Sequence, residues 1–464
     1  MSENIMRMWL NIIRGLVPNK QEKLQNRISS MPLAATSNGV EQVHAVKSLE
    51  TKKFESSTEE ESGRRVSSCY LRDSMITRMR TQGVSQDDLV RKLFGLNNVL
   101  WVLFSLYFLR LLVVRTIHGL SPVCIDFLLT SIYDAPKIIL MFGLIWASSY
   151  AFYLILYLER KKLLSRMLTN ALLRFCLLLL LILPCKWVLS CEYPVVPSFS
   201  VAAQATCFFL KIHSFVAVVE RECWRGTSLD LLLDWKMFSY FLVAPTLVYR
   251  VKGYPRTKEI RWKCFFGLFI QGCGLLFVMY LIMTEYMLPL FHNASDIHSI
   301  EFVVTLIVPT GIFYLLFFIL IFEVMLNGFA ELTRFGDRLF YEDWWNSVTH
   351  DEFLRKWNRP VYNYLMKIVY SHCRKMGTNR LKAMTLTIAY SSVLHELVLA
   401  VSFRRLRLYL MSLMMTQTPL IWLMNILLRI QERRPVYRQI SNIFFWNYIF
   451  LGPTLLMLIY SREY

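Results

Sequence analysis

A histidine and a glutamate stand in the middle of an apolar stretch of the chain, where ionisable groups are costly. His395 and Glu396 lie near the centre of residues 381–402. An ionisable group at that depth in a membrane helix normally faces the bundle interior or an aqueous cavity. Ser391 precedes His395 by four residues and Ser402 follows it by seven, so helical spacing places all three on one face. This polar stripe predicts the wall of a buried chamber; from position alone, a catalytic base and a hydrogen-bond cluster between helices both remain open.

A second unusual segment, residues 329–346, combines aromatic rings with acidic and amide side chains. It is too charged to cross a bilayer and too aromatic for an ordinary solvated loop. Aromatic rings suit an interfacial helix or an acyl-lined pocket. An interfacial belt does not explain the interleaved polar groups. These groups are Glu331, Asp337, Asp343 and Asn346, among the rings of Phe335, Phe340, Tyr341, Trp344 and Trp345, with Trp357 and Asn358 following.

The composition shows which elements must position these residues. Of 464 residues, 55 % are hydrophobic and 18 % are charged, whereas soluble domains carry about 25 % charged residues. Apolar runs near the ~20 residues that span a bilayer begin after residue 95. They predict an all-α, polytopic membrane protein with about nine transmembrane helices that enclose a catalytic chamber. The expected spans are 96–117, 137–158, 168–190, 198–219, 264–286, 302–325, 381–402, 408–428 and 443–460, and the shorter run 238–249 predicts a re-entrant or interfacial segment.

The charge distribution divides the chain into two parts and orients it. Residues 1–95 are rich in Ser, Glu and Arg and predict a largely disordered tail, with residues 96–464 as the membrane-embedded domain. The net charge of +19 comes mainly from loops after alternate spans, whereas 191–197 and 286–301 contain no Lys or Arg. The positive-inside rule therefore places the N-terminus in the cytosol. The basic balance reflects topology, so no nucleic-acid partner is expected; the three arginines within 404–407 are the exception to the pattern.

One segment resembles a known sequence motif. Phe340-Tyr-Glu-Asp-Trp-Trp-Asn346 resembles the FYxDWWN motif of the sterol and diacylglycerol O-acyltransferase branch of the membrane-bound O-acyltransferase superfamily. Residues 254–262, with the order Tyr-Pro-Arg-Thr and then Arg-Trp, look like a stretch of the sterol enzymes. Residues 330–338 resemble their approach to the motif, and His213-Ser-Phe215 a shorter one. The His395-Glu-Leu397 run looks most like fungal-type sterol enzymes.

The resemblance implies roles for individual residues. His395 aligns with the family's catalytic histidine, and Asn358 with the asparagine placed opposite it. Tyr362 stands where the family has a second histidine, which puts that histidine's role in doubt here. The resemblance implies that the substrate and acyl-CoA site includes Tyr341, Asp343, Trp344, Trp345, Asn346, Trp357 and Ser391.

The expected activity is esterification of the 3-hydroxyl of a membrane sterol by a long-chain acyl-CoA. Diacylglycerol O-acyltransferase is the nearest alternative, because it shares the motif, and a non-enzymatic lipid transporter is a distant one. The acyl donor is already activated, so neither a metal nor a cofactor is expected. Candidate contacts for the phosphates of coenzyme A are Arg334, Arg338, Arg380 and Lys382. Location in the endoplasmic reticulum and a homo-oligomeric state, dimer or tetramer, are implied by the resemblance.

Overall fold

The computed structural model describes residues 134–292, 298–419 and 435–463, with parts of one helix within 106–117. In these ranges the chain is helical, and one isolated β-bridge is the only strand-like pairing among the described residues. The all-α fold class is confirmed for this part of the chain. The predicted tail, its boundary at residue 95 and most of the span predicted at 96–117 lie outside the described residues.

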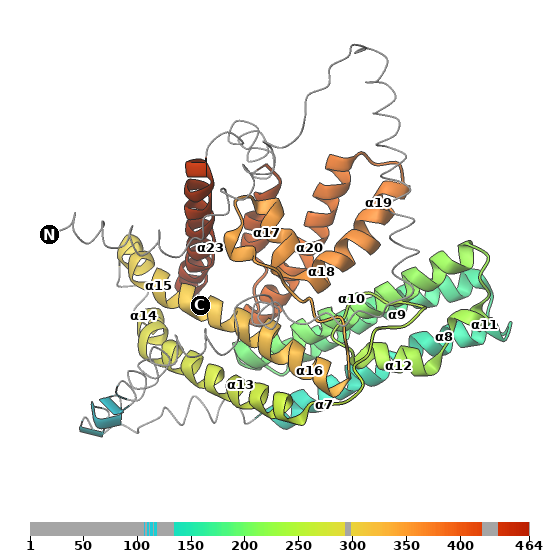
Figure 1. Ribbon diagram of the computed structural model, residues 1–464, viewed down its shortest axis with the longest axis horizontal. Helices are drawn as coiled ribbons and strands as arrows, with labels where there is room; N and C mark the ends of the chain where they lie inside the picture. The colour runs from blue at the N-terminus through green and yellow to red at the C-terminus, as the bar shows by residue number, and fades with distance from the viewer. Residues whose placement is uncertain are drawn as a thin grey trace, which may run out of the picture. The chain divides into compact units, whose positions relative to one another are not determined.

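Seven helices of the described part are long and apolar enough to cross a membrane (Figure 1). They correspond to seven of the nine predicted spans, which confirms a multi-pass membrane protein. The span predicted at 408–428 begins as a helix and then leaves the described residues. The seven are Ala135–Arg160, Arg166–Ser190, Val195–Trp224, Trp262–Phe291, Ser299–Leu332, Arg380–Phe403 and Gln439–Tyr460.

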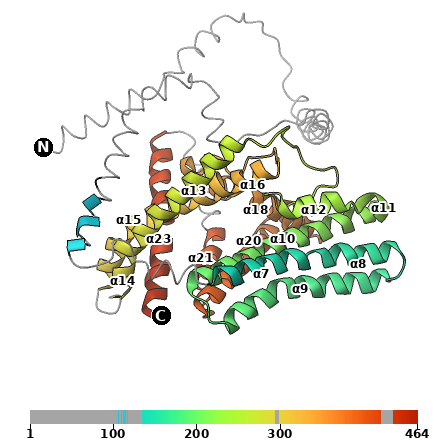
Figure 2. The same cartoon turned by 90° about the horizontal axis from the view of Figure 1, so that it is seen from below.

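The first three described spans pack beside one another. The first is α7 (Ala135–Ser148) followed by α8 (Tyr150–Arg160), with Ser149 at the junction. Both pack on α9 (Arg166–Ser190), and α9 packs on α10 (Val195–Trp224) (Figure 2). In α10, 67 % of the spanning window is buried, against 28 % in the first two spans. α10 is therefore a central helix of the membrane domain, against which α20 also packs.

The short apolar run 238–249 does not cross the membrane. It forms the end of α12 (Trp235–Val243) and an irregular stretch after it. The buried ammonium of Lys211 in α10 donates to the carbonyl oxygens of Phe241 at 2.9 Å and Ala244 at 2.6 Å. A cation at a helix C-terminus satisfies carbonyl groups that the helix leaves unpaired. Lys211 therefore fixes this segment against the central helix.

The next two spans are interrupted by π-helical turns, which often occur at functional sites. The second of them extends beyond the predicted 302–325 and ends beside the polar segment of the sequence motif. In chain order the elements are α13 (Trp262–Ile282), η1 (Met283–Met287) and α14 (Leu288–His292), then α15 (Ser299–Phe318), η2 (Ile319–Met325) and α16 (Leu326–Leu332). The shorter elements elsewhere are α11 (Leu229–Leu232), η3 (Trp344–Asn346), α17 (His350–Trp357), α18 (Arg359–Tyr364), η4 (Leu365–Tyr370) and α19 (Ser371–Lys375).

The helix that carries His395, α20 (Arg380–Phe403), has defined ends. The Asn379 side chain accepts the amide of Lys382 at 2.8 Å and caps its start. The carboxylate of Glu396 accepts the amides of Leu408 at 2.7 Å and Met411 at 3.0 Å. These amides open α21 (Tyr409–Met415), whose own N-cap residue supplies no side-chain bond. Glu396 thus caps the next helix, and α23 (Pro435–Glu463) follows later in the chain.

The arginine-containing loop that disagreed with the charge pattern has a structural explanation. Arg404 ends α20 in the left-handed conformation, with φ of 55°. Its guanidinium donates to the carbonyl oxygen of Tyr193 at 3.0 Å. Tyr193 belongs to 191–197, a loop without Lys or Arg, so both loops lie at the same end of the bundle. Arg404 is held by a protein carbonyl, and its charge does not require the cytosolic side.

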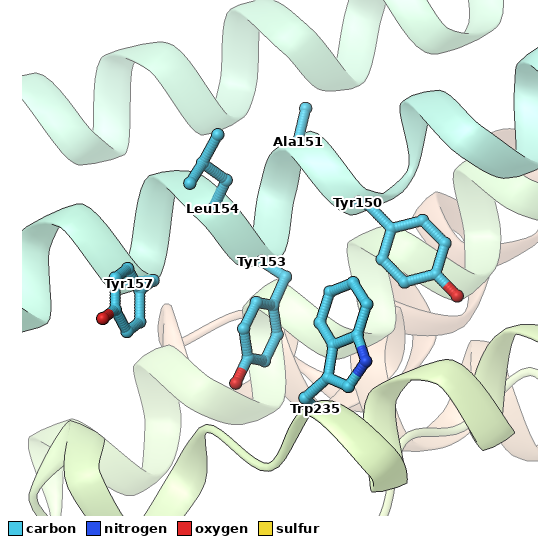
Figure 3. Close-up of a pocket in the computed structure, with 6 residues that line it drawn as sticks. All are labelled: Tyr150, Ala151, Tyr153, Leu154, Tyr157 and Trp235. Carbon is cyan, nitrogen blue, oxygen red and sulfur yellow. The ribbon is translucent and has the colours of Figure 1, made fainter.

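An aromatic groove of about 450 Å³ lies between α8 and α12 (Figure 3). The rings of Tyr150, Tyr153 and Trp235 face one another across it. The hydroxyl of Tyr153 donates to the carbonyl of Leu233 at 3.3 Å, which fixes one wall. None of its lining residues comes from α18 or α20, so this groove is separate from the helices that carry Asn358 and His395.

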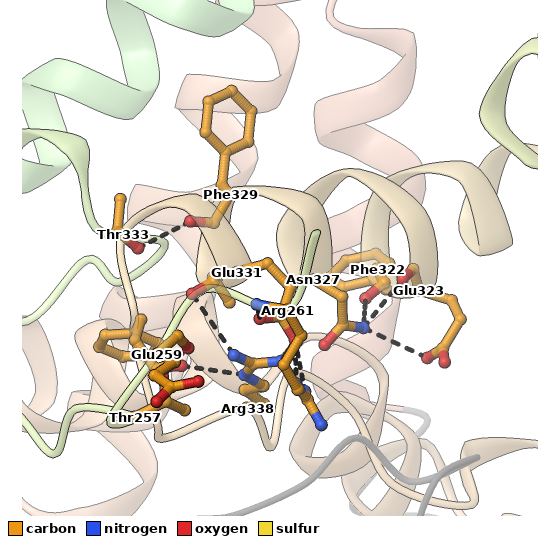
Figure 4. A network of polar contacts seen from close by, with 12 residues as sticks. Thr257, Glu259, Arg261, Phe322, Glu323, Asn327, Phe329, Glu331, Thr333 and Arg338 are labelled. Carbon is orange, nitrogen blue, oxygen red and sulfur yellow. Dashed lines mark hydrogen bonds and ion pairs between the residues drawn. The ribbon is translucent and has the colours of Figure 1, made fainter. Parts of the chain in front are cut away.

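A buried ion network joins the end of α16 to the segment that leads into the motif (Figure 4). Glu331 is fully buried, and its carboxylate accepts from Arg338 at 2.6 Å and from the Nε of Arg261 at 2.8 Å. The two segments that resembled sterol enzymes also pair with each other. Gly336 donates its amide to the carbonyl of Pro255 at 2.8 Å, beside the isolated β-bridge. These contacts hold the motif's approach in one conformation.

We expect Arg338→Met to destabilise the protein, because it leaves part of a buried carboxylate unpaired. Breaking such a pair costs about 3–5 kcal/mol. Thermal unfolding of the detergent-solubilised protein measures the loss. Arg355→Met is the matched control, because its ion pair with Asp351 lies on an exposed helix face, where such pairs contribute about 0–1 kcal/mol. Equal unfolding temperatures for the two variants would contradict the structural role of Arg338.

Candidate active site

The motif at residues 340–346 forms a compact turn that several elements hold by their backbones. The amide of Arg359 donates to the carbonyl of Phe340, and the amide of Glu342 to that of Lys356, both at 2.9 Å. From α23, the side-chain amide of Asn442 donates to the carbonyls of Trp345 at 2.9 Å and Ser347 at 2.8 Å. The motif therefore ties α17, α18 and α23 together.

An aromatic cluster fills the space beneath this turn. Trp344 is 2 % exposed and packs against Trp357 at 4.7 Å and Phe318 at 5.1 Å between ring centroids. Trp357 also stacks on Tyr314 at 5.1 Å. Pairs of this geometry contribute about 0.5–1.5 kcal/mol beyond the burial of their area. Trp344 has little surface to offer a ligand, so its place in the motif is explained by packing.

Asp343 belongs to an ion-pair network at the edge of the motif. Lys356 contacts the carboxylate of Asp343 at 2.9 Å and that of Glu352 at 2.7 Å. Burial tends to raise the pKa of Asp343, but the hydrogen bond and charge of Lys356 outweigh it and hold that pKa below its usual range. Asp343 is thus a carboxylate at neutral pH. Asn346 beside it is exposed.

A carboxylate that the sequence reasoning missed contacts the motif from inside a membrane span. Glu323 lies in the π-helical turn η2, and the hydroxyl of Tyr341 donates to its Oε2 at 3.0 Å. Burial, followed by the charge of Glu323, raises the pKa of the Tyr341 phenol. Tyr341 is 2 % exposed. A lone glutamate in an apolar run was the available signal, because such residues mark functional sites by default.

Asn358 lies between α17 and α18 and caps the second of them. Its Oδ1 accepts the amide of Val361 at 3.1 Å. This bond satisfies one of the free amides of the helix start and fixes the side chain. The amide group of Asn358 has two further donor hydrogens on its nitrogen. The side chain is half-buried.

The imidazole of His395 is oriented by its own helix. Its Nδ1 lies 2.8 Å from the carbonyl oxygen of Ser391 and 3.5 Å from the Ser391 hydroxyl. A carbonyl oxygen can only accept, so Nδ1 carries the proton in this arrangement. The neutral ring then keeps an unprotonated Nε2, which is the form that accepts a proton.

His395 is accessible on a helix that packs against several other elements. Its side chain is exposed, while the next residue, Glu396, is buried. The helix that carries the ring, α20, packs against α9, α10, η4, α19 and α21. His395 is therefore accessible on a helix that several other elements contact.

The four basic side chains differ in their availability. Arg380 and Lys382 are exposed in the first turn of α20, the same helix as His395. Arg334 is exposed, although its Nε donates to the carbonyl of Thr257 at 3.0 Å. Arg338 is 4 % exposed and paired with Glu331. Three of the four can therefore meet an anion without rearrangement, and Arg338 cannot.

The structure gathers the predicted residues in two groups. Tyr341, Trp344 and Trp357 form one aromatic cluster, with half-buried Trp345 against its edge. Ser391 and His395 share α20, and η4, which continues α18 beyond Asn358, packs against α20. The aromatic cluster supports the loop that carries Asn358 and is distinct from the His395 face.

The known proteins to which the chain is similar include sterol and diacylglycerol O-acyltransferases. The chain is 38 % identical over 239 residues to Sterol O-acyltransferase 2 of Saccharomyces cerevisiae, covering 48 % of this chain and 36 % of that one. It is 33 % identical over 292 residues to Sterol O-acyltransferase 1 of Mus musculus, covering 61 % and 53 %. It is 33 % identical over 232 residues to Diacylglycerol O-acyltransferase 1 of Dictyostelium discoideum, covering 48 % and 36 %.

The chain thus spans between about a third and a half of the length of these relatives. The matched family is described as MBOAT, the membrane-bound O-acyltransferase family, and the match runs over residues 231–462, half of the chain. This range contains the motif turn, Asn358 and His395. With its multi-pass helical fold, the chain belongs to the membrane-bound O-acyltransferase family.

Proposed function

We propose that this protein is an acyl-CoA-dependent sterol O-acyltransferase with His395 as its general base. The observation that carries the proposal is the hydrogen bond from Nδ1 of His395 to the Ser391 carbonyl. It leaves Nε2 free to accept a proton, and the ring is accessible. An alcohol is a poor nucleophile, and a positioned base speeds such reactions by about 10²–10⁴-fold.

The reaction balances with the residues present. Nε2 of His395 takes the proton of the sterol 3-hydroxyl as its oxygen attacks the carbonyl carbon of the thioester. The tetrahedral intermediate collapses with cleavage of the carbon–sulfur bond, and the imidazolium returns the proton to the departing thiolate of coenzyme A. The products are a sterol ester and free coenzyme A.

Asn358 supplies the second function that this chemistry requires. The oxyanion of the tetrahedral intermediate needs a fixed donor, and one such donor contributes about 3–4 kcal/mol. The cap bond to Val361 holds the Asn358 side chain by its oxygen. Its Nδ2 donors remain for the thioester oxygen. Trp345 and Trp357 keep accessible surface for an acyl chain, whereas Tyr341 and Trp344 support the turn from within.

Coenzyme A approaches from the basic side of the membrane in this proposal. The loops that contain Arg334, Arg380 and Lys382 belong to the cytosolic set by the positive-inside rule, as does the N-terminus. Arg404, the exception, is bound to the Tyr193 carbonyl at the opposite end. The endoplasmic reticulum membrane and a dimeric or tetrameric assembly complete the proposal.

Diacylglycerol is the alternative acceptor, because Diacylglycerol O-acyltransferase 1 of Dictyostelium discoideum is also a relative. The sterol assignment is supported by two sterol O-acyltransferases at 33 % and 38 % identity. It is also supported by the pairing of residues 254–262 with the approach to the motif, since both segments resembled the sterol branch.

We expect His395→Ala to lose about 10²–10⁴-fold of the rate of ester formation, because the base is removed. Membranes from a host without its own activity, supplied with labelled oleoyl-CoA and sterol, provide the assay. His372→Ala is the control, since that histidine is exposed in α19. Ester formation by His395→Ala at the wild-type rate and protein level would remove His395 from the mechanism.

The choice of acceptor is decided by one competition experiment. Wild-type membranes receive labelled oleoyl-CoA with equal amounts of sterol and diacylglycerol, and thin-layer chromatography separates the products. We expect label in the sterol ester. Label only in triacylglycerol would assign the protein to the alternative activity.

Lys382→Ala should raise the KM for oleoyl-CoA and leave kcat unchanged, because a phosphate contact far from the thioester contributes to binding alone. The rise should shrink at high salt, where charges are screened. Lys161→Ala changes an exposed lysine after α8 and serves as the control. A fall in kcat at constant KM would contradict the phosphate-binding role.

A further inference from the structure

Three polar side chains from different elements form a hydrogen-bonded chain inside the bundle. The Nδ1 of His213 lies 2.6 Å from the hydroxyl of Tyr364, which lies 2.9 Å from the hydroxyl of Tyr390. Tyr364 is fully buried. Burial raises the pKa of its phenol, so it stays neutral and can both donate and accept. Whichever way the donors point, each of the three groups has a partner.

The chain connects the two elements that carry the candidate catalytic groups. Tyr364 is the last residue of α18, whose first turn is capped by Asn358. Tyr390 precedes His395 by five residues in α20. A short rigid path therefore runs from Asn358 through α18 and the two phenols to His395. His213 anchors this path to the central helix α10.

The helix changes its type next to Tyr364, at the place where it packs against α20. Directly after Tyr364 the helix changes to the π-helical turn η4, which packs against α20. π-helical turns are rare and are frequent at functional sites. Tyr390 also projects from a different face of α20 than His395, since five residues turn an α-helix by about 500°. The phenol pair thus holds a face of α20 other than the one that carries His395.

We propose that Tyr364 and Tyr390 are positioning residues that set the separation of Asn358 and His395, with His213 as their fixed end. The inference rests on the proposed function of those two residues. Neither phenol touches substrate in this role. Reacting groups must be held closely, because a displacement of about 1 Å can reduce a rate by about 10²-fold.

We expect Tyr390→Phe to lower kcat by about 10- to 100-fold and to leave the KM for oleoyl-CoA unchanged. Tyr364→Phe should lower kcat at least as much, because it removes the bond to His213 as well as the bond to Tyr390. The double variant should fall no further than Tyr364→Phe, because that variant already lacks both bonds. Tyr153→Phe is the matched control, since it removes one phenol hydrogen bond, to Leu233, in α8.

Two substitutions of His213 test its role as the fixed end of the chain. His213→Gln retains an acceptor for the Tyr364 hydroxyl and should keep most of the activity. His213→Leu cannot accept and should behave like Tyr390→Phe. Equal activity of the two His213 variants would overturn the role of His213.

Hydrogen exchange provides a readout that needs no turnover. In Tyr390→Phe the amides of residues 359–370 should exchange faster than in the wild type, and Tyr153→Phe should leave them unchanged. An unchanged kcat per folded enzyme in Tyr390→Phe overturns the proposal, as does unchanged exchange. If the wild type esterifies diacylglycerol in place of sterol, the proposed acceptor is wrong and the same kcat comparison is made with diacylglycerol.

Discussion

Polar groups inside the bundle must be satisfied by the protein, because hydrocarbon offers them no hydrogen bonds. At three places the described helices meet this constraint with partners from other elements. Lys211 binds two carbonyls at the end of α12, Glu331 gathers two arginines, and Glu396 caps α21. Each bond joins separate elements, so satisfying the polar groups also determines how the helices are arranged.

The same constraint separates structure from chemistry within the motif. Trp344 and Tyr341 are enclosed, and the turn's backbone is held by α17, α18 and α23. A side chain that is fully occupied in packing cannot also contact a substrate. The motif is therefore a structural junction next to Asn358, whereas His395, the proposed base, is exposed.

The helical class and seven spans followed from periodicity and composition, because bilayer thickness dictates the length of a span. The interior pairings did not follow. Arg338 was expected to contact a phosphate of coenzyme A, but it is buried and paired with Glu331. Glu331 lies seven residues before Arg338 and also binds Arg261, which is seventy residues away from it. Only the folded chain shows these contacts. Likewise, the contact of Glu323 with Tyr341 and the hydrogen-bonded chain of His213, Tyr364 and Tyr390 join residues far apart in sequence, so the sequence alone did not predict them.

The proposed role of His395 sets two opposing requirements. A general base needs an accessible ring, yet the helix that carries it must not rotate or slide. Different faces of α20 meet the two requirements. On the accessible face, the carbonyl of Ser391 orients the imidazole, whereas Tyr390 and Glu396 on other faces hydrogen-bond to other elements. Rigidity thus comes from neighbours of His395 in sequence that point elsewhere in space. A glutamate beside a membrane histidine is therefore explained as an anchor for the helix, without a role in proton transfer.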